Sequence, residues 1–361
     1  MMRLRLQLVL LLLLLHDIVL PLAAVAGANT LKRAPLPLPP TGLSNGHANV
    51  VEFGADPSGG DASDQGINAA IAAVNANGGH AVLLFPPGQY KVIAPLTPLV
   101  GHDITVLGHG AHVQWMSTTH YQALLSFTAV STQPVTMQGD LLRGADIVNL
   151  TGVPDGAVSS RHTLLRLNSS EVFYHITTDS TRNNRKGELL SFSSVVGAGS
   201  PGVIQAFVHG KGPLFGFAKA NTTATAIEPS TNIKVLGLGV TGMGAIHETT
   251  AMTFDGVQGL SVSGVFLDAV NVGIAFSSSH RVSVTQNTFS RIDMVGLGYS
   301  VVIGTFNLAV MISGNVGDKG RHFVTTGGED GISRGISIVG NTFRECISYP
   351  VSAFRCVSIA R

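Results

Sequence analysis

The sequence predicts an all-β chain that folds as a right-handed parallel β-helix, a solenoid in which each turn of the chain adds one strand to each of several sheets. Three observations support this fold class. Glycine makes up 43 of the 361 residues and charged residues only 12%, a composition typical of short strands joined by tight turns. Short apolar runs recur at a nearly constant interval in the later part of the chain, and a single short helix precedes them.

The first element of the chain, residues 1–28, has the features of a secretory signal. Two basic residues, Arg3 and Arg5, precede the uninterrupted apolar run Leu8–Leu15, and small residues follow that would permit cleavage. The alternative is a membrane anchor, which needs about 18 apolar residues. Asp17 ends the run sooner, so the sequence favours secretion, with no membrane partner after cleavage of the signal.

The folded domain is predicted to span residues 49–361, after a Pro-rich linker at residues 29–48. A short strand is expected at residues 50–53. Ser63 is placed as the N-cap of a helix that ends before Gly78, because apolar residues then recur at helical spacing. Two further strands are expected at residues 81–85 and 89–93.

Repeated units fill the last part of the chain, and their openings resemble one another. The steps between successive openings are 27, 22, 28 and 26 residues, for units that begin at Asn232, Gly259, Arg281, Ala309 and Gly335. A second strand follows in most units, at residues 251–255, 273–277, 299–303 and 322–326. A repeat of this length with two or three strands per unit indicates one rung of a solenoid. The alternative, a β-sandwich, would need hairpin signals that are nearly absent.

The segment FGADPSGGDASDQGINAAIAAVNANGGHAVLLFPPGQYKV, residues 53–92, resembles the opening of the pectate-lyase-like superfamily of secreted and phage-tail-spike-like β-helix proteins. Residues 186–197 also look like a segment of tail-spike-like members. The resemblance implies that the helix caps the N-terminal end of the solenoid, and that the usual ligand is an extracellular polysaccharide. Hydrolases, lyases and non-catalytic binding proteins share this scaffold, so the resemblance does not select a reaction.

Aspartates are the first group of candidate catalytic residues. Hydrolysis of a glycosidic bond uses two carboxyl groups roughly 5–9.5 Å apart, and equivalent positions on adjacent rungs lie about 4.8 Å apart. Asp268, Asp293 and Asp318 follow their opening strands at similar distances and are expected in one turn column, with Asp255 directed outward from its strand. The other interpretation is that these aspartates keep a turn solvated.

A second candidate group lies in GDKGRHFVTTGGEDG, residues 317–331, where charged residues gather in a chain that has few. Cleavage of a uronic-acid polymer by elimination needs a cation beside the carboxylate and a base for the C5 proton. Arg321 and His322 fit these roles, with Lys319 and Ser277 as substrate-binding residues. If Phe323 packs inward, His322 faces out. The structural alternative is a polar corner held by ion pairs.

Other signals are weaker. Leu107–Gly110 contains a Gly-His-Gly sequence like that of polygalacturonases, but its partner motifs are missing, so we interpret it as a turn. Cys346 and Cys356 either form one disulfide or stay as two buried thiols. No cofactor is expected; a Ca²⁺ ion on the aspartates is conceivable, with no motif for one. A net charge of +1 disfavours nucleic acid as a partner.

The sequence thus predicts a secreted protein that cleaves an extracellular polysaccharide by elimination or hydrolysis. The alternative is a non-catalytic carbohydrate-binding or surface protein. Clustering of the five candidate residues would favour an enzyme, whereas scatter over different faces would favour a binding protein. These residues are Asp255, Asp268, Asp293, Arg321 and His322.

Overall fold

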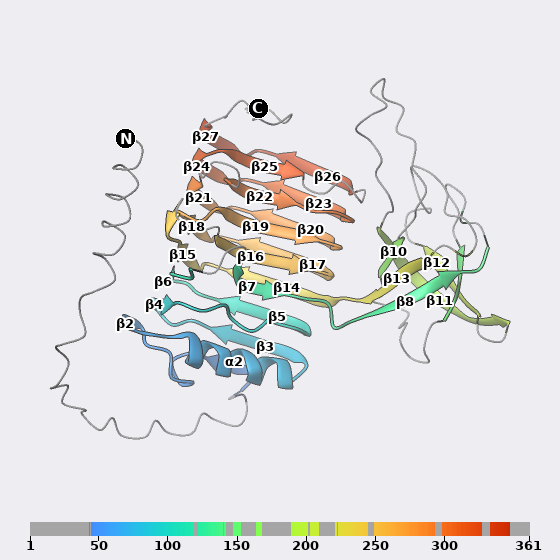
Figure 1. Cartoon of the computed structure of the whole chain (residues 1–361), viewed down its shortest axis with the longest axis horizontal. Coiled ribbons are helices and arrows are strands. Elements are labelled where there is room, and N and C mark those ends of the chain that lie inside the picture. The colour runs from blue at the N-terminus through green and yellow to red at the C-terminus, as the bar shows by residue number, and fades with distance from the viewer. Residues whose placement is uncertain are drawn as a thin grey trace, which may run out of the picture. The chain divides into compact units, whose positions relative to one another are not determined.

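The chain forms a parallel β-helix, as the sequence predicts, and Figure 1 shows its rungs stacked from helix α2 to strand β27. The computed structural model describes residues 43, 45–118, 122–139, 141, 147–152, 164–167, 189–200, 203–208, 221, 223–244, 249–292, 298–326 and 333–346. The predicted signal, most of the linker, Asp293 and Cys356 lie outside these residues.

Three parallel sheets make up the described part of the β-helix. Sheet A contains β1 (His47–Asn49), β3 (Gly79–Leu84), β5 (His102–Leu107), β14 (Ser230–Leu236), β17 (Val257–Ser263), β20 (His280–Thr285), β23 (Leu308–Ser313) and β26 (Arg334–Val339). Sheet B contains β2 (Ser58–Ala62), β4 (Gly88–Val92), β6 (Ala111–Trp115), β15 (Gly239–Thr241), β18 (Phe266–Asp268), β21 (Thr288–Ile292), β24 (Val316–Gly320) and β27 (Thr342–Cys346). Sheet C contains β7 (Gln122–Phe127), β16 (Thr249–Asp255), β19 (Val272–Ser277), β22 (Tyr299–Ile303) and β25 (His322–Thr326).

The core runs along the inside of the coil, because alternate residues of each strand point inward. Val235, Val262 and Val284 occupy one register position on successive rungs of sheet A, and each is fully buried. In sheet C the rings of Phe127 and Phe254 stack with centroids 4.8 Å apart. Equivalent positions on successive rungs therefore carry similar apolar side chains, which is why the apolar repeat is visible in the sequence.

Helix α2 (Asp64–Ala76) lies at the N-terminal end of the coil (Figure 1). Its apolar face is buried, as the helical spacing predicts. Ser63 is at the N-cap position, as the sequence predicts, although its Oγ makes no capping hydrogen bond. The hydroxyl instead accepts from the Asp56 backbone N–H at 3.1 Å and donates to the Asp56 carbonyl at 3.2 Å, so it fixes the loop that enters the helix.

Two predicted boundaries near the N-terminus are corrected. Residues 50–53 form a turn and not a strand. The strand is β1, which lies just upstream and partly inside the predicted linker. It pairs in parallel with β3, so the first residues of sheet A come from a segment whose Pro-rich neighbours mask its pattern.

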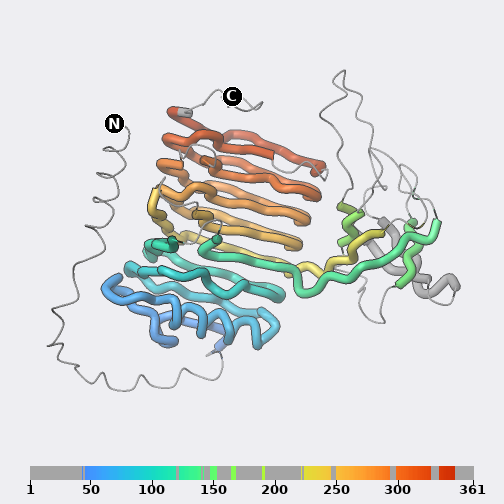
Figure 2. The backbone as a smooth tube through the Cα atoms, viewed as in Figure 1, coloured from blue at the N-terminus to red at the C-terminus, as the bar shows by residue number. Residues whose placement is uncertain are grey.

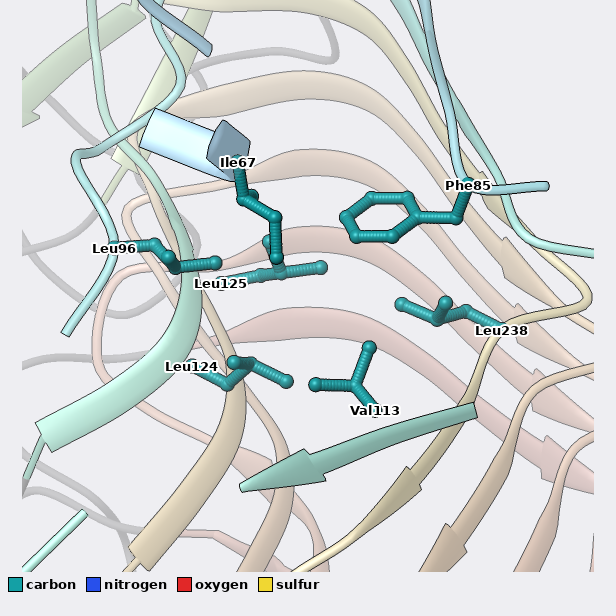
Figure 3. Close-up of a pocket in the computed structure, with 7 residues that line it drawn as sticks. All are labelled: Ile67, Phe85, Leu96, Val113, Leu124, Leu125 and Leu238. Carbon is teal, nitrogen blue, oxygen red and sulfur yellow. The ribbon is translucent and has the colours of Figure 1, made fainter. Parts of the chain in front are cut away.

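The interior beneath α2 is packed with apolar side chains, which Figure 3 shows pointing toward one another. They leave no room for a water molecule between them. We therefore interpret this gap as core packing and not as a ligand site. Its lining residues are Ile67, Phe85, Leu96, Val113, Leu124, Leu125 and Leu238.

An asparagine ladder joins the last rungs at the turn between sheets A and B. Asn315 Oδ1 accepts from the backbone N–H and from Nδ2 of Asn287, both at 3.0 Å. Asn315 Nδ2 donates to Asn341 Oδ1 at 2.8 Å and to the Val284 carbonyl at 2.9 Å. The side chains of Asn287 and Asn315 are almost fully buried, so each rung satisfies polar groups that the turn would otherwise leave unpaired.

An antiparallel barrel interrupts the coil between β7 and β14, as the path of the tube in Figure 2 shows. Its strands are β8 (Ser131–Met137), β9 (Ile147–Thr151), β10 (Leu164–Leu167), β11 (Leu189–Ser200), β12 (Val203–Val208) and β13 (Thr223–Glu228). The sequence did not indicate this insertion. Arg166 contacts the β-helix, donating from Nη1 to Ser278 Oγ at 3.4 Å, with its guanidinium carbon 5.6 Å from the centroid of the Phe306 ring.

Candidate functional site

The charged stretch near residue 320 forms the corner between sheets B and C. Strand β24 ends at Gly320, β25 begins at His322, and Arg321 is the one residue between them. The chain therefore passes from sheet B to sheet C through a single residue. Lys319 is exposed at the end of β24 and has a left-handed backbone, with φ 53°.

Three side chains meet at this corner: Tyr299, Arg321 and His322, which we call the corner cluster. Tyr299 and His322 are register partners on adjacent rungs, and their rings stack at 5.6 Å with 20° between the planes. Arg321 Nη1 donates to the Tyr299 hydroxyl at 3.0 Å, and its guanidinium carbon lies 5.5 Å from the centre of the same ring. Tyr299 thus holds both the cation and the imidazole.

The direction of His322 follows from Phe323. The Phe323 ring is buried and stacks on Phe343 at 4.4 Å. Two glycines make room for it, because a Cβ at Gly317 or Gly320 would come within 2.2 or 2.8 Å of the ring. Phe323 is therefore inside the coil, as expected, and strand alternation directs His322 to the other side, against Tyr299.

The corner cluster is largely shielded from solvent, since Arg321 and His322 are each only 6% exposed. Burial lowers the pKa of His322 below its usual value near 6.5, and the adjacent Arg321 charge lowers it further. Both effects disfavour the imidazolium. His322 is therefore neutral at neutral pH, which is the form that accepts a proton.

Asp255 and Ser277 lie elsewhere, at the far end of sheet C. They are register partners, and Ser277 Oγ donates to Asp255 Oδ1 at 2.8 Å. Ser277 is five residues along β19 from Val272, the position that aligns with Tyr299. Five residues of strand span roughly 17 Å, so these two predicted site residues do not join the corner cluster.

Asp268 lies in sheet B and is 7% exposed. Arg291, on the next rung, donates from Nε to Asp268 Oδ1 at 2.8 Å, and its Nη2 contacts the second carboxylate oxygen. This two-point ion pair satisfies both oxygens. Asp268 is thus held in a largely buried ion pair within a strand, a role that differs from the solvated turn residue of the alternative interpretation.

The predicted aspartate column exists in part, but in a strand rather than in a turn. Asp268, Ser290 and Asp318 are register partners on three successive rungs. Two rungs separate the carboxylates by about 9.6 Å, close to the upper limit for an inverting hydrolase. Ser290, and not Asp293, occupies the middle position.

Sequence reasoning missed Tyr299 as a site residue. A usable signal was present, because Tyr299 and His322 are each the first residue of a second strand in the repeat. Aligning those strands places one above the other. The Gly-His-Gly sequence at residues 108–110 forms the turn between β5 and β6, as expected.

The part of the chain that the structure describes contains no group of three metal-binding side chains. Among the same residues, no helix has the length and apolarity needed to cross a bilayer.

Comparison with known proteins identifies structural relatives. No protein-family model matches this chain, and neither does any curated protein. Tailspike gp49 of Pseudomonas phage LKA1 superposes with a TM-score of 0.61 at 16% identity, over 80% of this chain and 50% of that one. Tailspike gp61 of Pseudomonas phage phi297 gives 0.63 at 16%, over 82% and 52%. The Gp54 tailspike of Acinetobacter baumannii bacteriophage AP22, solved with a capsular saccharide, gives 0.55 at 12%, over 82% and 46%.

This chain therefore has the parallel β-helix fold of these tailspikes, and it spans about half of their length.

Proposed function

We propose that this protein is secreted and acts on an extracellular polysaccharide, cleaving uronate-containing chains by elimination at the corner cluster. One observation carries the proposal: the Tyr299 phenol contacts both the Arg321 guanidinium and the neutral His322 imidazole. The fold supports the ligand class, since one tailspike of this fold was solved with a capsular saccharide. The predicted N-terminal signal, residues 1–28, supports secretion.

The three groups match the needs of the reaction. Arg321 faces the substrate carboxylate and stabilises the charge that develops when the C5 proton leaves. His322 accepts that proton, and the electron pair forms the C4–C5 double bond as the bond from C4 to its glycosidic oxygen breaks. The Tyr299 hydroxyl supplies a proton to the departing oxygen. The products are a saturated chain and a chain with an unsaturated uronate end.

A second function, polysaccharide binding without cleavage, is favoured by a different observation. The predicted catalytic residues are distributed over sheets B and C, and two of the corner groups are almost buried. Asp268 is neutralised by Arg291. A protein that only binds glycan needs neither an unpaired catalytic carboxylate nor a solvent-exposed base.

The test is an activity screen on the secreted chain with polygalacturonate, alginate and neutral glucans. Ultraviolet absorbance reports unsaturated uronate ends, and a reducing-sugar assay reports all new ends. We expect absorbance with a uronate polymer that is lost in His322→Ala and falls about 100-fold or more in Tyr299→Phe. His47→Ala, an exposed histidine in β1, is the matched control and retains activity.

Two results would contradict elimination. Reducing ends without absorbance would indicate hydrolysis and direct attention to Asp268 and Asp318, tested by Asp318→Asn. No new ends on any polymer, with binding retained, would leave the non-catalytic function.

A further inference from the structure

A row of aromatic rings crosses the outer face of sheet B. His112, Gly239 and Phe266 are register partners on three successive rungs. Because Gly239 lacks a side chain, the His112 ring lies where its Cβ would be, 2.6 Å from Nδ1. The centroids of His112 and Phe266 are consequently 6.5 Å apart, although two rungs separate their backbones by about 9.6 Å.

The same arrangement occurs three residues earlier in the chain, on the same rung. His109, in the turn before β6, lies over Gly237, where a Cβ would meet its Nδ1 at 2.2 Å. Gly237 has φ 67°, a left-handed conformation that favours glycine. Two imidazoles thus rest on glycines of the following rung, and we call His109, His112 and Phe266 the ring platform.

The ring platform is open to solvent and has polar groups beside it. Phe266 is 41% exposed. His112 Nε2 lies 2.8 Å from Thr241 Oγ1, and the ion pair of Asp268 with Arg291 is two residues along the strand from Phe266. A single exposed phenylalanine is ordinary. An exposed ring beside a glycine-seated imidazole, a hydroxyl and a planar ion pair is a site with directional hydrogen-bonding groups.

We propose that the ring platform is a second glycan-binding surface, separate from the corner cluster, that takes neutral pyranose residues of a polysaccharide. It rests on the proposed function for the class of ligand. A pyranose has an apolar C–H face that packs on a flat ring, and hydroxyls at its edge that bond to planar polar side chains. Asp268 and Arg291 neutralise each other, so the surface favours an uncharged sugar over a uronate.

The glycine floor explains how such a surface arises on a β-helix. Side chains of adjacent rungs usually stack directly above one another and leave a corrugated face. Removing the side chain at position 239 lets His112 lean along the coil axis and makes the surface continuous with Phe266. Gly239→Ala would displace the imidazole and break this continuity.

The test is affinity electrophoresis in native gels that contain hydroxyethylcellulose, laminarin or polygalacturonate. We expect one of the two neutral glucans to retard the wild-type chain, and Phe266→Ala to weaken that retardation about tenfold in apparent Kd. Gly239→Ala should also weaken the retardation by the neutral glucan. Val316→Ala is the matched control: it removes a residue 42% exposed in the same outward column, two rungs beyond Phe266, and behaves as wild type. Circular dichroism verifies folding of each variant.

The two proposals fail separately. His322→Ala is expected to lose cleavage while keeping retardation by the neutral glucan. The ring platform is refuted if no neutral glucan retards the wild type, if Phe266→Ala binds as wild type, or if Val316→Ala loses as much. Retardation by polygalacturonate alone would refute the preference for a neutral sugar, whatever the outcome of the cleavage screen.

Discussion

Replacing Asn315 by alanine tests how the turns of the coil are held. The side chain makes four hydrogen bonds: it accepts two from Asn287 and donates one each to Val284 and Asn341. It is 1% exposed, so water cannot take its place in the folded state. Asn315→Ala removes all four bonds and leaves the backbone N–H of Asn287 buried without its acceptor.

The size of the effect follows from these bonds. A hydrogen bond contributes about 1 kcal/mol net, and a buried donor left unpaired costs about 1–3 kcal/mol. The expected loss in the free energy of unfolding is therefore about 3–5 kcal/mol. Asn341 is only partly buried, so water replaces its partners, and Asn341→Ala should cost about 1–2 kcal/mol.

The measurement is urea denaturation followed by far-ultraviolet circular dichroism, with fluorescence of the buried Trp115 as a second probe near the N-terminal end of the coil. Two probes are needed because rungs of a repeat fold can unfold separately. Ser313→Ala, at the partly exposed last residue of β23 just before this turn, should stay within about 0.5 kcal/mol of wild type. A loss below about 1 kcal/mol for Asn315→Ala would refute the argument.

Three further predictions concern single sites. Gly66→Ala should destabilise the fold by about 1–3 kcal/mol in the same denaturation assay, because the new Cβ would lie 2.2 Å from the Ala55 backbone nitrogen. This holds although alanine favours a helix more than glycine does. The control Ala72→Gly, on the exposed side of α2, should cost only about 1 kcal/mol. The Ser300 hydroxyl is buried and has no hydrogen-bond partner among the described residues, so Ser300→Ala should raise the midpoint or leave it unchanged, and a clear decrease would reveal a missed bond. The pKa of His322 is lower in the folded state than its usual 6.5, so the stability that the neutral imidazole contributes is complete above about pH 6.5 and is lost as the pH falls through the lowered value. The melting temperature of His322→Phe should therefore decline less than that of the wild type between about pH 7 and 5. Parallel curves of melting temperature against pH would contradict this.

The rungs were predictable because the repeat reflects backbone geometry as well as packing. The units open at Asn232, Gly259, Arg281, Ala309 and Gly335, and all five residues have a left-handed backbone, with φ between 55° and 76°. That conformation marks the same bend on each rung, followed by inward apolar residues. The strands of the barrel pair antiparallel and are not repeats of one rung, so no sequence repeat marks them.

The site was harder to predict because register, and not spacing in general, decides which side chains meet. Counting nine residues from each opening gives Asp268 from 259, Ser290 from 281 and Asp318 from 309, and these are the register partners found. Asp293 is three residues further on, so it cannot share that position. A count from the unit opening that is allowed to vary by a few residues therefore groups side chains that are not register partners in the β-helix.

The barrel also has a consequence for the order of folding. Most bonds between adjacent rungs join residues 22–28 apart, but those between β5 and β14 join residues 129 apart. Closing the longer loop costs about 1.5 kcal/mol more in chain entropy. Ser131 and Glu228, at the two ends of the barrel, are register partners, so a barrel that folds first brings the two halves of the coil within reach. The insertion would then set the rate at which the N-terminal and C-terminal rungs join.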